Sequence, residues 1–274
     1  MSAEIEVAVD LTNPGQYFAC CGLLELAHRM WPGAEGWFEG GVFHVRAAGG
    51  GEELWKALRD CEIANTMTGA QKRRRQELGE MGQRAWKADP ALEEEKKALD
   101  ALWRKAPVRL GEPFGFRVDW FLDDRSGGAA LKTWAGKQAA VDTVETLRAL
   151  LPEAATLDAP ALTDRVPFYF DSNVGGVGDD IDVGFSFDPL KDSAGLRVAM
   201  QPAIELLAFV GLQRFRPVRM DKVWEYSVWQ AASSAELAAL ICCGVVQRRA
   251  ERRFRFGLVA RTDYTKSFLP GRPV

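Results

Sequence analysis

The chain has 274 residues, of which 47% are hydrophobic and 27% are charged, a balance typical of a folded globular protein. Its net charge of -3 excludes nucleic-acid binding by bulk charge, so such a partner would have to meet a local basic surface. No apolar run reaches the ~18 residues of a membrane-spanning helix, and no signal-peptide pattern opens the sequence. We therefore expect a cytoplasmic protein without a membrane partner.

The cysteines form two adjacent pairs and a single residue, namely Cys20, Cys21, Cys61, Cys242 and Cys243. This spacing matches neither a zinc site nor the disulfide framework of a small secreted domain. Because both pairs lie in apolar segments, we expect buried free thiols and a reducing compartment.

The first 48 residues predict a strand, a helix and a hairpin. Apolar residues alternate between Ile5 and Val9, as in a half-buried strand. Asn13 is a suitable N-cap and Pro14 a suitable first residue for the helix that follows. Gly40-Gly41 separates two β-rich runs, which is a hairpin signal. This order begins an α+β fold with an antiparallel sheet and packed helices.

A basic arm is expected next. Residues 52–58 predict a short helix, residues 65–88 are polar and basic without an apolar stripe, and residues 91–103 predict a helix dense in charge. The run Lys72, Arg73, Arg74 and Arg75 is either a phosphate clamp or solvated surface. We assign residues 1–106 to an N-terminal unit that carries this arm, and residues 107–274 to a C-terminal α+β part. One continuous domain is the alternative.

The centre of the sequence predicts a strand over 116–122, a glycine-rich loop and a helix over 131–151. The candidate nucleic-acid ligands here are Arg125, Lys132, Trp134 and Lys137. Cations and an aromatic ring at a helix N-terminus can hold a phosphate backbone. An ordinary turn, with Trp134 packed into the core, gives the same pattern.

The C-terminal part predicts strands over 166–170, 183–187, 224–228 and 253–258, an apolar helix over 203–211, and a segment over 235–246 that reads as helix or strand. Its basic candidates are Arg248, Arg249, Arg252, Arg253 and Arg255. If Phe254 and Phe256 face the core, Arg253 and Arg255 share the other face of the sheet. A basic sheet face binds nucleic acids in many proteins, and a charge-protected edge strand is the alternative.

Signals for catalysis are weak. His28 and His44 are the two histidines, and neither lies in a metal-binding or nucleophile motif. Asp179, Asp180 and Asp182 lack the spacing of a calcium loop and are interpreted as a solvated turn. We expect no cofactor, no metal and no enzymatic activity.

Three blocks of the sequence together resemble a known family. They are NPGQYFACCGLLELA (13–27) with WPGAEGWF (31–38), DWFLDDR (119–125) with KTWAGKQ (132–138), and ELLAFVGLQRFRP (205–217). In these blocks the chain is similar to small proteins encoded in type I-U (also called I-G) CRISPR loci.

The resemblance implies a non-catalytic subunit of a crRNA-guided surveillance complex of the Cascade kind, acting in antiviral defence. Its partners would be the guide RNA, target DNA with its flanking motif, and other Cascade subunits, following the logic of RNA-guided recognition. A large-subunit-like role is favoured over that of a backbone subunit with RRM- or ferredoxin-like core elements. Two alternatives stay open: a crRNA-processing endoribonuclease that uses His28 or His44, and a structural adaptor that presents some of the nine tryptophans.

Overall fold

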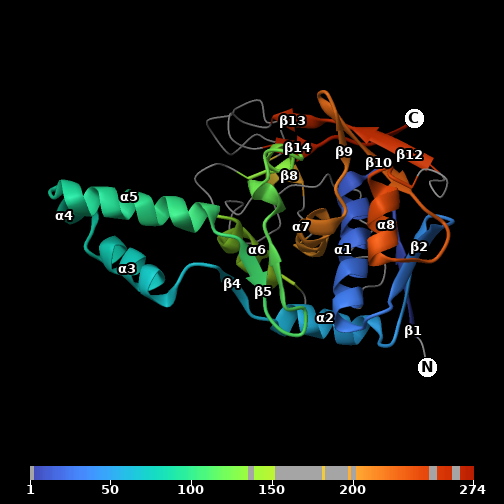
Figure 1. The fold of residues 1–274 in the computed structure, drawn as a ribbon, viewed down its shortest axis with the longest axis horizontal. Helices are drawn as coiled ribbons and strands as arrows, with labels where there is room; N and C mark the ends of the chain where they lie inside the picture. Colours follow the sequence, from blue (N-terminus) through green and yellow to red (C-terminus); the bar gives the residue numbers. More distant parts are fainter. Residues whose placement is uncertain are drawn as a thin grey trace.

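The structure is a computed structural model. It describes residues 3–134, 139–151, 181–182, 197–198, 202–246, 252–260 and 266–274 (Figure 1). Helices and antiparallel sheets share one buried core, so the α+β class predicted from the sequence is confirmed. The predicted boundary between residues 106 and 107 stays a prediction.

The first sheet contains β1 (Ala3–Ala8), β2 (Glu35–Glu39), β3 (Val42–Ala47) and β11 (Ser233–Ser234), in the order β1-β3-β2-β11. Strand β3 lies between β1 and β2 and is antiparallel to both. Together with helix α1 these strands form a split β-α-β unit, the arrangement that opens a ferredoxin-like fold. Strand β11 then extends the β2 edge.

Helix α1 (Pro14–Met30) covers one face of this sheet and is buried over most of its length. The side chain of Asn13 accepts a hydrogen bond from the Gln16 backbone N–H, as predicted for an N-cap, and Pro14 occupies the first turn.

A close helix pair forms the centre of the core. Helix α7 (Pro202–Arg214) packs along α1, and Figure 1 shows the two side by side. At the crossing Gly22 faces Gly211, and a Cβ atom built on Gly22 would lie 1.9 Å from the Leu207 carbonyl oxygen. The backbones are therefore in contact at a place where no side chain fits.

The second sheet has the order β15-β12-β10-β9, with β9 (Val218–Met220), β10 (Val223–Val228), β12 (Arg252–Phe256) and β15 (Arg272–Pro273). Its inner face contributes aromatic rings to the core. The Tyr226 ring stacks on Tyr17 of α1 at a centroid distance of 4.2 Å, and the Tyr17 hydroxyl donates to the Ser227 carbonyl at 2.8 Å.

A third sheet, β4 (Ile63–Asn65), β5 (Val108–Leu110) and β6 (Phe116–Val118), is flanked by α2 (Gly51–Asp60) and α6 (Ala140–Ala149). Between β4 and β5 the chain leaves the body as α3 (Gly69–Glu80), α4 (Gln83–Lys87) and α5 (Pro90–Lys105). In Figure 1 these three helices project away from the other elements. We call them the arm.

The remaining described elements are short. They are α8 (Ala235–Cys242) and the strands β7 (Ile181–Asp182), β8 (Arg197–Val198), β13 (Leu258–Ala260) and β14 (Lys266–Phe268). Helix α8 decides the ambiguous segment 235–246 in favour of helix. The strands predicted over 166–170 and 183–187 lie outside the described residues.

The centre of the sequence differs from its prediction. Strand β6 ends at Val118 rather than residue 122, and two 3-10 turns follow, η1 (Trp120–Leu122) and η2 (Ala129–Leu131). The next helix begins at Ala140, not at Leu131. Leu131 and Trp134 are buried at a spacing that imitates a helical stripe, but tertiary packing of an irregular loop produces it.

Candidate nucleic-acid interface

The outer face of the second sheet carries a group of exposed arginines. Phe254 and Phe256 of β12 are buried, whereas Arg253 and Arg255 point to the opposite side, as the alternation predicted. Their side chains are 56% and 44% exposed. Arg255 lies directly opposite Arg272 of β15 in the register, and residues paired in this way share a face. Arg253, Arg255 and Arg272 are called the arginine face below.

One carboxylate lies under the arginine face. Glu225 of β10 is opposite Arg255, its side chain is 11% exposed, and its Oε1 accepts from the Arg255 guanidinium at 2.8 Å. The second oxygen lies 4.0 Å from Arg253. Glu225 is the one acidic residue in the described strands of this sheet, so three guanidiniums face one carboxylate. The three guanidiniums and one carboxylate leave a net charge of two, and all three arginine side chains are exposed.

The other C-terminal arginines are placed differently. Arg252 is exposed but lies on the same side of β12 as Phe254 and Phe256, two residues before the first of them, so it lies at the end of the inner side and not on the arginine face. Arg248 and Arg249 lie outside the described residues. Arg272 was not among the candidates, because nothing in the sequence signals that a two-residue C-terminal strand pairs with β12.

The basic run of the arm divides into two pairs. Helix α3 begins with a capping box between Thr68 and Gln71, and its Arg74 forms two hydrogen bonds to Glu95 of α5, at 2.8 and 2.9 Å. Arg75 reaches Asp100 at 2.9 Å and stacks over the Trp103 ring. These two cations are used within the arm.

Lys72 and Arg73 differ from their neighbours in the run. Arg73 is exposed and Lys72 is partly exposed, and neither forms an ion pair within the described part of the chain. Lys72 acts at longer range on Glu145 of α6, whose pKa is raised by burial and by Asp142 and is partly lowered again by Arg148 and Lys72. Of the four cations predicted to form a phosphate clamp, Lys72 and Arg73 are therefore the two that remain available to a ligand.

The central loop places its candidates in distinct environments. Trp134 is 2% exposed, and its ring packs edge-on against Trp120 and Phe121, so the core-packing alternative holds for this residue. Lys132 is half-buried, with its ammonium 5.1 Å from the centre of the Trp134 ring. Arg125 is exposed, whereas Lys137 lies outside the described residues.

The glycine pair of this loop serves packing. A Cβ atom on Gly128 would lie 2.0 Å from the Trp120 carbonyl oxygen, so only glycine allows the loop to close here. Asp123 caps the turn by accepting from the Ser126 hydroxyl and from two backbone N–H groups, and these bonds lower the pKa of Asp123. Arg216 lies 3.5 Å from the same carboxylate. The loop is thus a turn held by hydrogen bonds to Asp123, and it is not the N-terminus of an α-helix.

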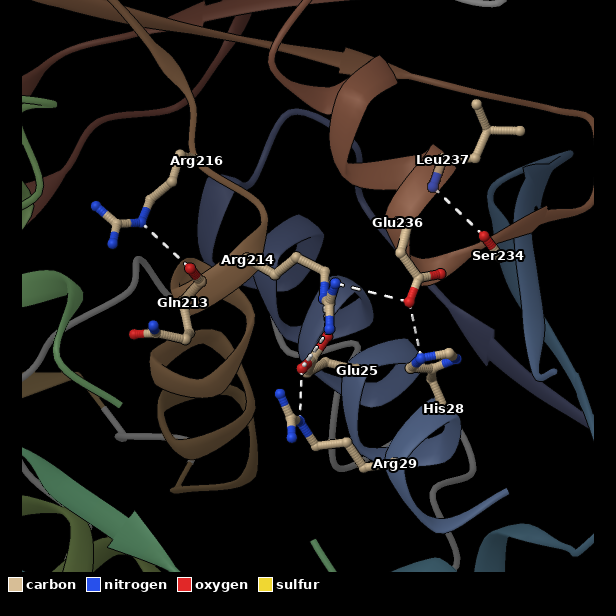
Figure 2. A network of polar contacts seen from close by, with 9 residues as sticks. All are labelled: Glu25, His28, Arg29, Gln213, Arg214, Arg216, Ser234, Glu236 and Leu237. Atoms are coloured by element: carbon tan, nitrogen blue, oxygen red, sulfur yellow. Dashed lines mark hydrogen bonds and ion pairs between the residues drawn. The ribbon is translucent and has the colours of Figure 1, made fainter. Parts of the chain in front are cut away.

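The histidines are held by carboxylates on opposite sides of the first sheet. His28 of α1 contacts Glu236 of α8 at 2.9 Å, within a network in which the buried Glu25 accepts from Arg29 and Arg214 (Figure 2). His44 lies on the face of β3 turned away from α1, where its Nδ1 is 3.1 Å from Glu4 and 3.5 Å from Glu6. The first sheet separates them, so they do not form one catalytic pair.

The first sheet also differs from a nucleic-acid platform. Its outer face carries the carboxylates of Glu4, Glu6, Glu35 and Glu39 with Arg46 as its cation. This charge repels phosphate, unlike the sheet surface on which RRM domains stack RNA bases.

A scan against protein-family models and searches of curated proteins and of solved structures found no match. Among the described residues, no helix combines the length and apolar character needed to cross a membrane.

Proposed function

We propose that this chain is a non-catalytic nucleic-acid-binding subunit of a crRNA-guided surveillance complex, and that its arginine face contacts the phosphate backbone of the guide RNA or of the target DNA. The observation that carries the proposal is the surplus of positive charge on this face. Arg253, Arg255 and Arg272 are neighbours in the register, and Glu225 offsets one of them. Planar guanidiniums with free donors bind phosphate oxygens in a bidentate manner.

The spacing of the arginines suits an extended strand of nucleic acid. Residues two apart on one strand lie roughly 6.5 Å apart, and neighbouring strands lie about 4.8 Å apart. Successive phosphates of an extended single strand are separated by a similar distance, so Arg253 and Arg255 can engage neighbouring phosphates. The resemblance to type I-U/I-G proteins supports a guide RNA or a target strand as the physiological ligand.

The alternatives have less support. An endoribonuclease would use His28 or His44 as its general base, and each of these imidazoles instead contacts carboxylates, Glu236 for His28 and Glu4 with Glu6 for His44. The adaptor alternative relied on exposed tryptophans, and each of the nine is buried or half-buried.

The proposal is tested with the variant Arg253→Ala/Arg255→Ala/Arg272→Ala. Binding of a fluorescent single-stranded RNA is followed by anisotropy at several salt concentrations. The matched control removes three exposed, ion-paired cations from other elements, Arg46→Ala/Lys56→Ala/Lys97→Ala, with the same change in net charge.

The variant removes the two positive charges that Glu225 leaves for phosphate, and at roughly 0.7 per phosphate for a single strand this reduces the slope of log K against log salt by about 1.4. The control variant keeps the wild-type slope. Equal slopes for the wild type and the arginine-face variant would remove the basis of the proposal. Cleavage of the RNA by the wild type, lost in His28→Ala or His44→Ala, would replace it with the endoribonuclease alternative.

A further inference from the structure

Three potential metal ligands converge on the outer face of the first sheet, away from the arginine face. Glu4 and Glu6 are two residues apart on β1 and therefore lie on the same side of it. Glu6 is directly opposite His44 of β3 in the register. One carboxylate oxygen from each glutamate and the His44 Nδ1 lie within 4.8 Å of one another.

The distances are close to those of a coordinated ion. Zinc binds imidazole nitrogen and carboxylate oxygen at about 2.0–2.2 Å, so two ligands of a tetrahedral site are about 3.4 Å apart. The His44 Nδ1 lies 3.1 Å from a Glu4 oxygen and 3.5 Å from a Glu6 oxygen. To bind one ion, the carboxylate oxygens of Glu4 and Glu6 must also come within this distance of each other. Their side chains are 50% and 64% exposed, so both are free to rotate toward the ion.

The imidazole is oriented by groups outside the trio. The His44 ring stacks on Trp37 of β2 with 5.0 Å between centroids and 5° between planes, and its side chain is 14% exposed. This stacking turns the Nδ1 edge toward the two carboxylates. Arg46 is opposite Glu4 in the register, but its guanidinium pairs with Glu35 and lies over the Trp37 ring. The ligand set is thus mounted on two hydrogen-bonded strands, β1 and β3, and Trp37 of the neighbouring strand β2 orients its imidazole.

We propose that Glu4, Glu6 and His44 form a binding site for a first-row divalent metal ion of the zinc type. Two carboxylates and one neutral imidazole balance the charge of a dication, and three protein ligands leave a coordination position for water. The site is independent of the proposed nucleic-acid binding, because it lies on a different sheet.

The test uses the full-length chain, stripped of metal with a chelator, and titrates it with Zn²⁺ in a calorimeter. A Cys243→Ser background removes the partly exposed thiol, which is a competing zinc ligand. Glu4→Gln/Glu6→Gln removes two ligands and keeps the side-chain shape. Glu39→Gln/Glu52→Gln is the control, since it removes two exposed carboxylates outside the trio. The imidazole signals of the two histidines are followed by NMR in the same titration.

We expect one equivalent of Zn²⁺ in the background and control proteins, binding at least about tenfold weaker in Glu4→Gln/Glu6→Gln, and a shift of the His44 signal without one at His28. The absence of saturable binding in the background protein would overturn the proposal, because the trio is then only an ion-paired histidine. Unchanged affinity in Glu4→Gln/Glu6→Gln, or a shift confined to His28, would also overturn it.

Discussion

The contact between α1 and α7 predicts that the smallest possible enlargement of Gly22 destabilises the protein. The substitution Gly22→Ala adds one methyl group at a helical position, where alanine is otherwise favoured over glycine by about 1 kcal/mol. Here the new Cβ would lie 1.9 Å from the Leu207 carbonyl oxygen and 3.0 Å from the Gly211 nitrogen. Both atoms belong to backbone within α7, so neither can rotate away.

The cost follows from the displacement that the helices must undergo. A normal contact of about 3.4 Å requires α1 and α7 to separate by roughly 1.5 Å, and a gap of this size forfeits more than half of the dispersion energy at the contact. Overpacking of this kind costs about 3 kcal/mol. After the gain in helix propensity, we expect a net loss of about 2 kcal/mol.

Urea unfolding followed by circular dichroism measures this difference through the shift in midpoint at constant slope. Gly79→Ala is the matched control, because it lies within helix α3 and no atom lies within 4 Å of its added Cβ. The control should be slightly more stable than the wild type. If Gly22→Ala proves as stable as the wild type, the close crossing of α1 and α7 is wrong.

Three further predictions concern residues with distinct roles. Trp134→Ala should lower the free energy of unfolding by about 4 kcal/mol in thermal or urea unfolding, while RNA affinity of the folded protein stays unchanged, because the ring is core; weaker RNA binding at full stability would contradict this. Glu25→Gln should cost about 2 kcal/mol in urea unfolding, since it removes a buried charge that two arginines contact; unchanged stability would refute that role. The hydrogen bond from Arg74 lowers the pKa of Glu95 below its ordinary 4.5, so the ion pair stabilises the arm fully above pH 4.5 and loses this effect as the pH falls below that value. During acidification the NMR signals of α3 and α5 should change before those of α1, and simultaneous changes would disagree with this.

Local signals in the sequence were sufficient where local chemistry decides the structure. The N-cap at Asn13 with Pro14 located the start of α1, and Gly40-Gly41 located the first hairpin. The alternation of Phe254 and Phe256 with arginines gave the two faces of β12. These features depend on residues a few positions apart, which a sequence displays directly.

Interactions between distant residues were not visible in the same way. Trp134 could be assigned to the core only once Trp120 and Phe209 were seen around it. The partners of Arg74 and Arg75 lie 21 and 25 residues further along, on a second helix of the arm. Such pairings are set by chain topology and not by composition.

The arginine face combines features that local sequence patterns predict with features that depend on distant strands. Arg253 and Arg255 followed from alternation, whereas the third member, Arg272, depends on the pairing of β15 with β12. The carboxylate of Glu225, which determines how much positive charge is left for a ligand, is contributed by β10, about 30 residues away. The sequence therefore identified the strand that carries the surface but not the charge balance of that surface.

Ultraviolet crosslinking identifies the segments of the chain that touch nucleic acid, and it can therefore detect contact through the arginine face. The chain is co-expressed with the other subunits of a type I-U/I-G surveillance complex and a guide RNA, and the purified material is irradiated with and without target DNA. We expect crosslinked peptides that contain residues 252–256 or 272–274, and we expect these crosslinks to be lost in Arg253→Ala/Arg255→Ala/Arg272→Ala. A complex that contains this chain and RNA, but whose crosslinks avoid both segments, would contradict it.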